Sequence, residues 1–219
     1  MTHPIGKREL VHIQAGQAQL EGNLALPDGA RGVVLFAHGS GSSRFSPRNN
    51  FVARDLFDAG VGSLLIDLLT PAEDADYRTR FDIPLLTTRL TAASNWLQKY
   101  PATQALKIGY FGASTGAAAA LQAAAELGDK IAAVVSRGGR PDLAGGHFLA
   151  RVSAPTLLIV GGDDDVVIQL NEQAYAQLRC TKELVIVPGA THLFEEPGTL
   201  EQVARHAAAW FKRYLVWES

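Results

Sequence analysis

The sequence has one cysteine, Cys180, and no excess of basic residues: its 219 residues include 20 Lys+Arg and 22 Asp+Glu. A single cysteine excludes a disulfide-stapled scaffold. Without a basic surplus the chain cannot neutralise many phosphates, which excludes a general nucleic-acid-binding role. No stretch approaches the roughly 18 consecutive apolar residues of a membrane helix, and the N-terminal residues lack the apolar segment of a secretory signal. We expect a soluble, cytoplasmic protein with no membrane partner.

Charged side chains are also scarce, at 19% of the residues, whereas hydrophobic residues make up 47%. A soluble domain usually carries about 25% charged residues, so this shortage indicates elements that are buried on two faces. The length is compatible with a single large hydrophobic core. Because no internal repeat, low-complexity tract or linker divides the chain, we predict one domain over residues 1–219.

Short apolar runs alternate along the chain with segments of helical spacing. The runs predict strands at residues 10–15, 18–26, 32–37, 61–66, 107–111, 131–135, 156–160 and 183–187. Helices are predicted at residues 47–59, 85–100, 115–127, 143–150, 168–178 and 199–215. This alternation indicates an α/β fold with about eight strands in a mostly parallel sheet, an N-terminal antiparallel hairpin at one edge, and helices on both faces. Ligands bind such sheets at the carboxyl ends of the strands.

Residues 112–116 read Gly-Ala-Ser-Thr-Gly between a predicted strand and a predicted helix, the context that the nucleophile-elbow pattern G-x-S-x-G requires. Ser114 would sit on a sharp, strained turn that projects its Oγ above the sheet. Gly112 and Gly116 would let the strand and helix approach closely. The N–H of Thr115 would open the helix, where unpaired donors and a positive dipole suit an oxyanion. The alternative is a glycine-rich turn with an idle serine.

A serine nucleophile needs a base and an orienting acid, and both residue types follow later strands. Three consecutive aspartates lie after the 156–160 strand, and His192 lies after the 183–187 strand. The order Ser, Asp, His is that of α/β-hydrolases. We favour Asp164 as the acid, with Asp163 and Asp165 as alternatives; Asp165 could instead only favour the start of the next helix. Adjacent carboxylates without a further ligand pattern do not predict a metal site.

Residues 38–42, His-Gly-Ser-Gly-Ser, follow the 32–37 strand. We assign the second oxyanion donor to the backbone N–H of Ser40, because this loop supplies that donor in the same architecture. The alternative is a glycine loop that cradles phosphate. That loop would need the GK[ST] of a P-loop or the third glycine of a dinucleotide fingerprint, and both are missing. We therefore predict no cofactor and no metal.

Four segments carry a resemblance to a known family: residues 38–42, 112–116, 161–167 and 189–192. Together they resemble the α/β-hydrolases, and the compact length and the G-x-x-D-x-x-V spacing of residues 161–167 are most similar to the dienelactone-hydrolase-like branch. The resemblance spans about residues 10–215. It implies a three-layer α/β-hydrolase sandwich, a Ser–Asp–His triad and hydrolysis of an ester-like bond. Dienelactone hydrolase itself uses a cysteine nucleophile, whereas this elbow carries Ser114, so the resemblance does not assign dienelactone as the substrate.

The segment that follows the 131–135 strand is too short for a lid domain, because residues 137–155 have room for only one short helix. The mouth of the site should therefore be shallow and open. Such a mouth favours small or protruding esters, thioesters and lactones over long acyl chains.

Six arginines lie near the same rim of the predicted sheet: Arg44, Arg48, Arg78, Arg80, Arg137 and Arg140. Arginine suits bidentate recognition of carboxylate or phosphate. Our hypothesis is that Arg44 or Arg137 binds an anionic group of the substrate. The alternative is surface ion pairing with the nearby acids, which are Glu73, Asp74, Asp76 and Asp142.

The function predicted from these residues is that of a serine hydrolase, which cleaves a small-molecule ester, thioester or lactone through an acyl-enzyme on Ser114. Two other functions stay open. One is a non-catalytic hydrolase-like domain that binds a ligand. The other is an acyltransferase or carbon–carbon hydrolase that uses the same triad.

Overall fold

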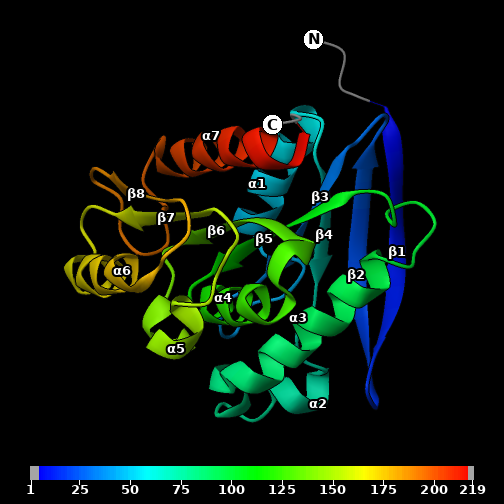
Figure 1. The fold of residues 1–219 in the computed structure, drawn as a ribbon, viewed down its shortest axis with the longest axis horizontal. Helices are drawn as coiled ribbons and strands as arrows, with labels where there is room; N and C mark the ends of the chain where they lie inside the picture. Colours follow the sequence, from blue (N-terminus) through cyan, green and yellow to red (C-terminus); the bar gives the residue numbers. More distant parts are fainter. Residues whose placement is uncertain (1–4, 217–219) are drawn as a thin grey trace.

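The computed structural model describes residues 5–216, and an eight-stranded sheet forms their centre (Figure 1). The strands are β1 (Gly6–Ala15), β2 (Ala18–Pro27), β3 (Gly32–Ala37), β4 (Gly62–Ile66), β5 (Lys107–Ala113), β6 (Ile131–Arg137), β7 (Thr156–Gly161) and β8 (Lys182–Val187). Their order is β1-β2-β4-β3-β5-β6-β7-β8. β2 pairs antiparallel with both β1 and β4, and the remaining pairs are parallel. The predicted sheet and its N-terminal hairpin are confirmed.

Helices cover both faces of the sheet (Figure 1). On one face lie α1 (Pro47–Asp58) and α7 (Thr199–Phe211), whose apolar side chains form one buried cluster with that side of the strands. On the other face lie α3 (Ile83–Leu97), α4 (Thr115–Leu127), α5 (Gly146–Leu149) and α6 (Asp165–Gln177), which pack around a second, larger cluster. The result is the three-layer sandwich of an α/β-hydrolase. No helix within residues 5–216 has the length and apolarity needed to cross a bilayer.

The connection between β6 and β7 is short, as the sequence predicts. It contains only a 3₁₀ turn, η3 (Pro141–Ala144), and the four-residue helix α5. No lid domain is inserted there, so this connection leaves the carboxyl edge of the sheet uncovered.

Two local features differ from the predicted elements. The structure adds a short helix, α2 (Pro71–Asp74), in which Thr70 and Glu73 form a reciprocal capping box, and a 3₁₀ turn, η1 (Thr79–Phe81). At the C-terminal side, α7 ends at Phe211, and residues Lys212–Val216 continue as a π-helical turn, η4. α2 and η1 are additional elements in the connection between β4 and α3. The change at the C-terminal side lies at the end of a helix, where capping and packing decide the boundary more than periodicity does.

The strand order creates a crevice at the carboxyl edge. From β3 the chain runs to β4 on one side and then crosses to β5 on the other, so neighbouring strands β3 and β5 send their following segments in different directions. Ligands bind at such switch points in open α/β sheets. Ala37 pairs with Gly112, and Ala113 pairs with Arg137. These registers place the loop after β3, the turn after β5 and the end of β6 side by side.

Candidate active site

The turn between β5 and α4 holds Ser114 in a strained backbone conformation. Ser114 has φ 50° and ψ −121°, a region that residues with a side chain rarely adopt. Three main-chain hydrogen bonds hold it there: its N–H donates to the Arg137 carbonyl (3.3 Å), and its own carbonyl accepts from Ala117 (3.1 Å) and Arg140 (3.1 Å). The surrounding backbone therefore keeps the serine in the geometry of a nucleophile elbow.

The two glycines of the elbow are required by close backbone approach. A methyl group on Gly112 would collide with the backbone of Ala117 in the first turn of α4. A methyl group on Gly116 would collide with the carbonyl oxygens of Ala37 and His38 at the end of β3. Both glycines thus let strand, helix and loop come together around Ser114, as the G-x-S-x-G pattern indicates.

Asp164 and His192 are in direct contact. The distance between Asp164 Oδ2 and His192 Nδ1 is 2.7 Å. Asp164 occupies the N-cap position of α6, yet its side chain does not cap the helix; the carboxylate binds the imidazole instead. Asp165 is the first residue of α6, where its negative charge complements the helix dipole. Of the three aspartates in this loop, the structure brings Asp164 to His192.

Ser114 and His192 line one cavity of about 280 Å³ at the carboxyl edge of the sheet. Within residues 5–216 the Ser114 hydroxyl makes no hydrogen bond, so it is free toward this space. Hydrogen bonds between nucleophile and base are often long without substrate and tighten when it binds. Phe81 and Leu193 also line the cavity, and both side chains are largely exposed for apolar residues. The cavity therefore combines a free hydroxyl, an imidazole and an apolar rim.

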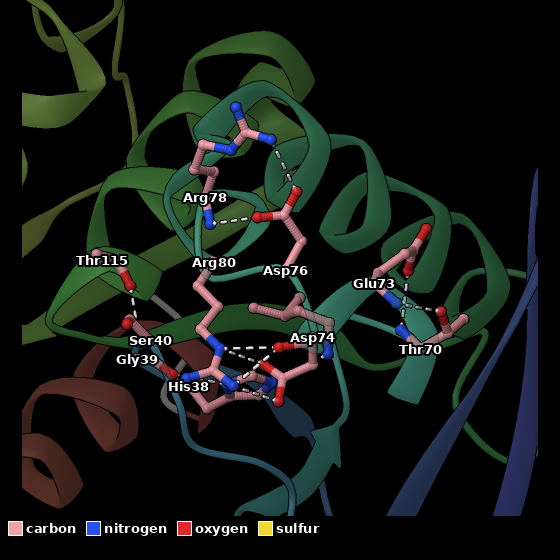
Figure 2. Close-up of polar contacts among 11 residues, drawn as sticks. His38, Gly39, Ser40, Thr70, Glu73, Asp74, Asp76, Arg78, Arg80 and Thr115 are labelled. Atoms are coloured by element: carbon pink, nitrogen blue, oxygen red, sulfur yellow. Dashed lines mark hydrogen bonds and ion pairs between the residues drawn. The ribbon is translucent and has the colours of Figure 1, made fainter.

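The Ser40 N–H, predicted as an oxyanion donor, already has a partner. It donates to Thr115 Oγ1 at 3.0 Å (Figure 2). The Thr115 N–H lies in the first turn of α4, where backbone donors have no partner within the helix. Ser40 and Thr115 thus lie together beside Ser114, but the Ser40 N–H must leave or share Thr115 Oγ1 before it can stabilise an oxyanion.

His38 fixes the loop that carries Ser40, a role that the sequence did not reveal. Its Nε2 accepts from the Leu68 N–H at 3.0 Å, so the proton resides on Nδ1, which donates to the Gly39 carbonyl at 2.9 Å. Burial lowers the pKa of His38 and keeps the ring neutral. Figure 2 also shows Arg80 bound to the carbonyl and the carboxylate of Asp74 beneath this loop. A buried imidazole therefore links the end of β3 to the end of β4.

The fold and the positions of Ser114, Asp164 and His192 at the carboxyl edge of the sheet agree with the protein family that the sequence matches. The profile described as the Dienelactone hydrolase family matches residues 20–217. The chain belongs to the dienelactone hydrolase family. The resemblance predicted from the sequence is thereby confirmed.

Individual relatives support this assignment. The crystal structure of a dienelactone hydrolase from Anabaena variabilis ATCC 29413 is 58% identical and superposes with a TM-score of 0.93, covering 96% of this chain and 99% of that one. An esterase, Pf2001, from Pyrococcus furiosus shares the fold at 19% identity and a TM-score of 0.78, covering 96% of this chain and 94% of that one. A protein of Mycobacterium tuberculosis (strain H37Rv) with the provisional name phosphoribosyl transferase is 56% identical over 207 residues, 94% of this chain and 46% of its own length. The chain thus spans about half of that curated relative.

Arg44 of this family member does not fit the hypothesis of substrate binding. Its guanidinium pairs with the carboxylates of Asp67 and Glu21. It lines a different cavity, between the hairpin and the end of β4, which contains neither Ser114 nor His192. Ion pairing, the alternative from the sequence, accounts for Arg44, but its partners Glu21 and Asp67 are not among the acids that the sequence suggested. Ion pairing also accounts for Arg78, Arg80 and Arg140, which pair with Asp76, Asp74 and Asp142.

Arg137 behaves differently from these arginines. It is only 5% exposed and lines the Ser114 cavity. Its hydrogen-bond partner is Asn49 Oδ1, at 3.4 Å, and its guanidinium lies 5.8 Å from the Phe194 ring centre. Burial, together with the charge of Arg48, lowers the pKa of Arg137 to about 10. Asn49, buried in the first turn of α1, was not singled out from the sequence, because nothing in its local pattern distinguishes it.

Another cavity, of about 390 Å³, lies between the hairpin, β4 and α1. It is larger than the Ser114 cavity, but neither Ser114 nor His192 lines it. Cys180 lies half-buried against Thr156 Oγ1 at 3.7 Å, at the amino end of β7 and therefore at the opposite edge from Ser114. Neither feature lies beside Ser114 or His192.

Proposed function

We propose that this protein is a serine hydrolase that cleaves a small ester, thioester or lactone through an acyl-enzyme on Ser114. The observation that supports it most is the 2.7 Å contact between Asp164 and His192 on the same cavity as the strained Ser114. Ser114, Asp164 and His192 follow three different strands at one edge of the sheet, and their chain order is that of a Ser–Asp–His triad. A domain that merely bound a ligand would have no need of this arrangement.

In the proposed reaction, Asp164 accepts the Nδ1–H of His192 and so leaves Nε2 free as the base. His192 takes the hydroxyl proton as Ser114 Oγ attacks the carbonyl carbon. The tetrahedral oxyanion receives hydrogen bonds from the N–H groups of Thr115 and Ser40, the latter after it leaves Thr115 Oγ1. His192 then protonates the departing alcohol, thiol or lactone oxygen. His192 then deprotonates a water molecule, whose oxygen attacks the carbonyl carbon of the acyl-enzyme. The acid leaves as the protonated His192 returns the proton to Ser114 Oγ.

The size of the cavity favours small substrates. Its volume of about 280 Å³ lies just below the range of roughly 300–1,000 Å³ found for drug-sized ligands. The short connection between β6 and β7 adds no wall that could enclose a long acyl chain. We therefore propose short-chain esters, thioesters and lactones as the substrate class.

The name of the Mycobacterium tuberculosis relative does not favour a transferase function. The matched region is 46% of that protein, so the name can refer to the other part. The matched region corresponds to a family of hydrolases. An acyltransferase that used the same triad would be recognised by transfer of the acyl group to an added alcohol or amine instead of water.

A fluorophosphonate probe tests the proposal directly. Mass spectrometry should place the label on Ser114, and Ser114→Ala should abolish labelling. The matched control is Ser42→Ala, which removes another hydroxyl from the same cavity wall and should leave labelling intact. With short p-nitrophenyl esters, Ser114→Ala should lower kcat by about 10⁴–10⁶-fold. Absence of labelling on Ser114, or turnover that survives Ser114→Ala unchanged, would refute the proposal.

A further inference from the structure

A buried amide joins the helix that follows Asp164 to the loop after β6. Asn171 of α6 has an exposed fraction of 0%, and its Nδ2 donates to the Gly139 carbonyl at 3.0 Å. The same amide donates to the Val167 carbonyl, one turn earlier in α6, at 2.8 Å. Asp164 is the N-cap residue of α6 and precedes Asn171 by about two turns. One side chain therefore ties the helix that positions the proposed acid to the segment that connects β6 with β7.

The loop that receives this hydrogen bond also holds the backbone of Ser114. The Ser114 N–H donates to the Arg137 carbonyl at 3.3 Å, and the Ser114 carbonyl accepts from the Arg140 N–H at 3.1 Å. The Arg140 N–H and the Gly139 carbonyl belong to the same trans, planar peptide group, so they point in opposite directions. Asn171 therefore holds one end of this peptide group, and Ser114 is bound at its other end.

Ser114 depends on such support because its backbone is strained. Its φ of 50° and ψ of −121° lie in a region that costs free energy for a residue with a side chain. A conformation of this kind persists only where the surrounding structure enforces it. The other hydrogen bond to the Ser114 carbonyl comes from Ala117, within α4 itself. The Arg140 N–H is therefore the donor that fixes this carbonyl from outside the β5–α4 unit.

Packing alone does not account for an asparagine at position 171. Among the described residues Asn171 Oδ1 has no hydrogen-bond partner, although the atom is buried. An unpartnered buried polar atom destabilises the fold, so an apolar side chain of similar size would suit a purely structural position better. The asparagine supplies a donor to the Gly139 carbonyl, which an apolar residue cannot do.

We propose that Asn171 is a positioning residue for the reaction at Ser114. By fixing the peptide group between Gly139 and Arg140, it keeps Ser114 in its strained conformation and keeps Oγ aimed at the cavity. Because Asn171 and Asp164 belong to one helical segment, the nucleophile and the acid are held in a fixed relation. This inference rests on the proposed serine hydrolase function and adds to it a residue that does not line the Ser114 cavity.

Two variants separate the contacts of Asn171. Asn171→Leu removes both hydrogen bonds, whereas Asn171→Ser can still donate to the carbonyl one turn earlier and releases only Gly139. With p-nitrophenyl butyrate, both variants should lower kcat by about 10–100-fold, because a displacement of about 1 Å at the nucleophile costs that much rate. KM should stay within about twofold of the wild type, since no residue of the cavity wall is changed. The rate of fluorophosphonate labelling at Ser114 should fall in parallel with kcat.

The matched control is Gln122→Leu in α4. Gln122 is also buried, and its Nε2 donates to the Ala144 carbonyl at 3.0 Å in the same connection between β6 and β7. The substitution removes a comparable amide–carbonyl bond at η3 and leaves the peptide group between Gly139 and Arg140 in place. Gln122→Leu should lower the melting temperature and keep kcat within about threefold of the wild type.

A comparison in the Ser114→Gly background tests the strain without any activity. Glycine adopts positive φ without strain, so the loop then has no strained residue to hold. With serine at this position, the hydrogen bond lost in Asn171→Ser is partly offset when Ser114 relaxes. The fall in melting temperature caused by Asn171→Ser should therefore be larger in the Ser114→Gly background, a departure from additivity that reports the coupling.

The positioning role and the hydrolase function can fail separately. Unchanged kcat in both Asn171 variants, an equal loss of kcat in Gln122→Leu, or equal falls in melting temperature in the two backgrounds would contradict the positioning role. Wild-type labelling of Ser114 would leave the hydrolase function standing in each of these cases. If the wild type is not labelled at Ser114, the hydrolase function fails and the positioning role fails with it. Asn171→Ser, which keeps the helical hydrogen bond, decides the matter if Asn171→Leu does not fold.

Discussion

Arg44 lies in the loop after β3 and Arg137 is the last residue of β6, both at the carboxyl edge of the sheet, and their surroundings differ sharply. Arg44 lies between two carboxylates, Asp67 and Glu21. Arg137 is more deeply buried and has an amide and an aromatic ring beside it, with no acid among the described residues. Arg44 therefore holds together the end of β4 and the hairpin, whereas Arg137 keeps its charge available in the cavity.

The difference shows that charge compensation decides what an arginine can do. An ion-paired guanidinium has its charge neutralised and its paired N–H groups occupied by the carboxylates. An uncompensated one lowers stability and retains binding capacity for a ligand. The same edge thus contains a region of paired charges around Arg44 and the proposed functional region around Ser114 and Arg137.

The largest effect is expected from the contact between Asp164 and His192, which should affect rate instead of stability. Asp164→Asn should lower kcat/KM by about 10³–10⁴-fold, because the imidazole loses the acceptor that fixes its tautomer. Asp163→Asn and Asp165→Asn are matched controls from the same loop and should stay within about threefold of wild type. Steady-state kinetics on a neutral short-chain ester measures all three. An equal loss in Asp163→Asn would move the acid to that residue.

An intermediate effect is expected from Arg44→Met, and it should appear in stability alone. The substitution leaves Asp67 and Glu21 without their cation, so the free energy of unfolding should fall by about 1–3 kcal/mol in urea titration. Arg78→Met, which removes an exposed pair, should change it by less than about 1 kcal/mol. The hypothesis that Arg137 binds an anionic substrate group predicts a preference for charged over neutral esters, and Arg44→Met should not change it. A loss of that preference would show that Arg44 belongs to the functional region after all.

The smallest effect concerns the bond between the Ser40 N–H and Thr115 Oγ1. Thr115→Val removes this acceptor, so an oxyanion no longer has to displace it. We expect kcat/KM to rise by up to about fivefold and the free energy of unfolding to fall by about 1 kcal/mol, the typical net contribution of one hydrogen bond. Thr115→Ser keeps the hydroxyl and is the control. A large fall in kcat/KM for Thr115→Val with normal stability would mean that the hydroxyl itself assists the reaction.

The pH dependence of the charged-ester preference gives an independent measure of the functional region. The pKa of Arg137 is lowered to about 10, chiefly by burial, so the guanidinium is charged at neutral pH and discharges as the pH rises through that value. The preference should therefore be constant from pH 7 to 9 and should decline toward pH 11. The ratio of kcat/KM for a charged ester to kcat/KM for a neutral ester separates the effect of the Arg137 charge from the pH dependence of the reaction itself.

Much of the fold could be predicted because the buried strands are short apolar runs with clear ends. The predicted bounds 32–37 and 115–127 agree with β3 and α4. Ser114 and Gly128 flank α4 at the points where the backbone turns. The loops of Ser114, Asp164 and His192 could be placed at one edge because parallel strands share their carboxyl ends. Thr70 and Glu73 have the spacing of a capping box, which marks the start of α2.

Contacts between distant segments could not be predicted in the same way. Glu21 approaches Arg44 only because β2 pairs with β4, a register that no local pattern specifies. Likewise, the Ser40 N–H meets Thr115 Oγ1 across 75 residues of sequence, and Asn49 meets Arg137 across 88. Tertiary packing decides which polar and charged groups find a hydrogen-bond or ion-pair partner. The sequence therefore identifies candidate site residues but does not specify their partners.

The pairing of β5 with β6 fixes the distance between the backbone of Ser114 and the backbone of Arg137 in the proposed active site. Ser114 and Arg137 are joined by one main-chain hydrogen bond, and adjacent strands lie about 4.8 Å apart. The spacing between the attacking oxygen and the guanidinium is therefore set by the sheet and by one arginine side chain, and it cannot adapt to the substrate as a mobile loop could. A series of charged esters with increasing distance between anion and carbonyl should show a sharp optimum in kcat/KM, and the position of that optimum reads out the span between the two residues.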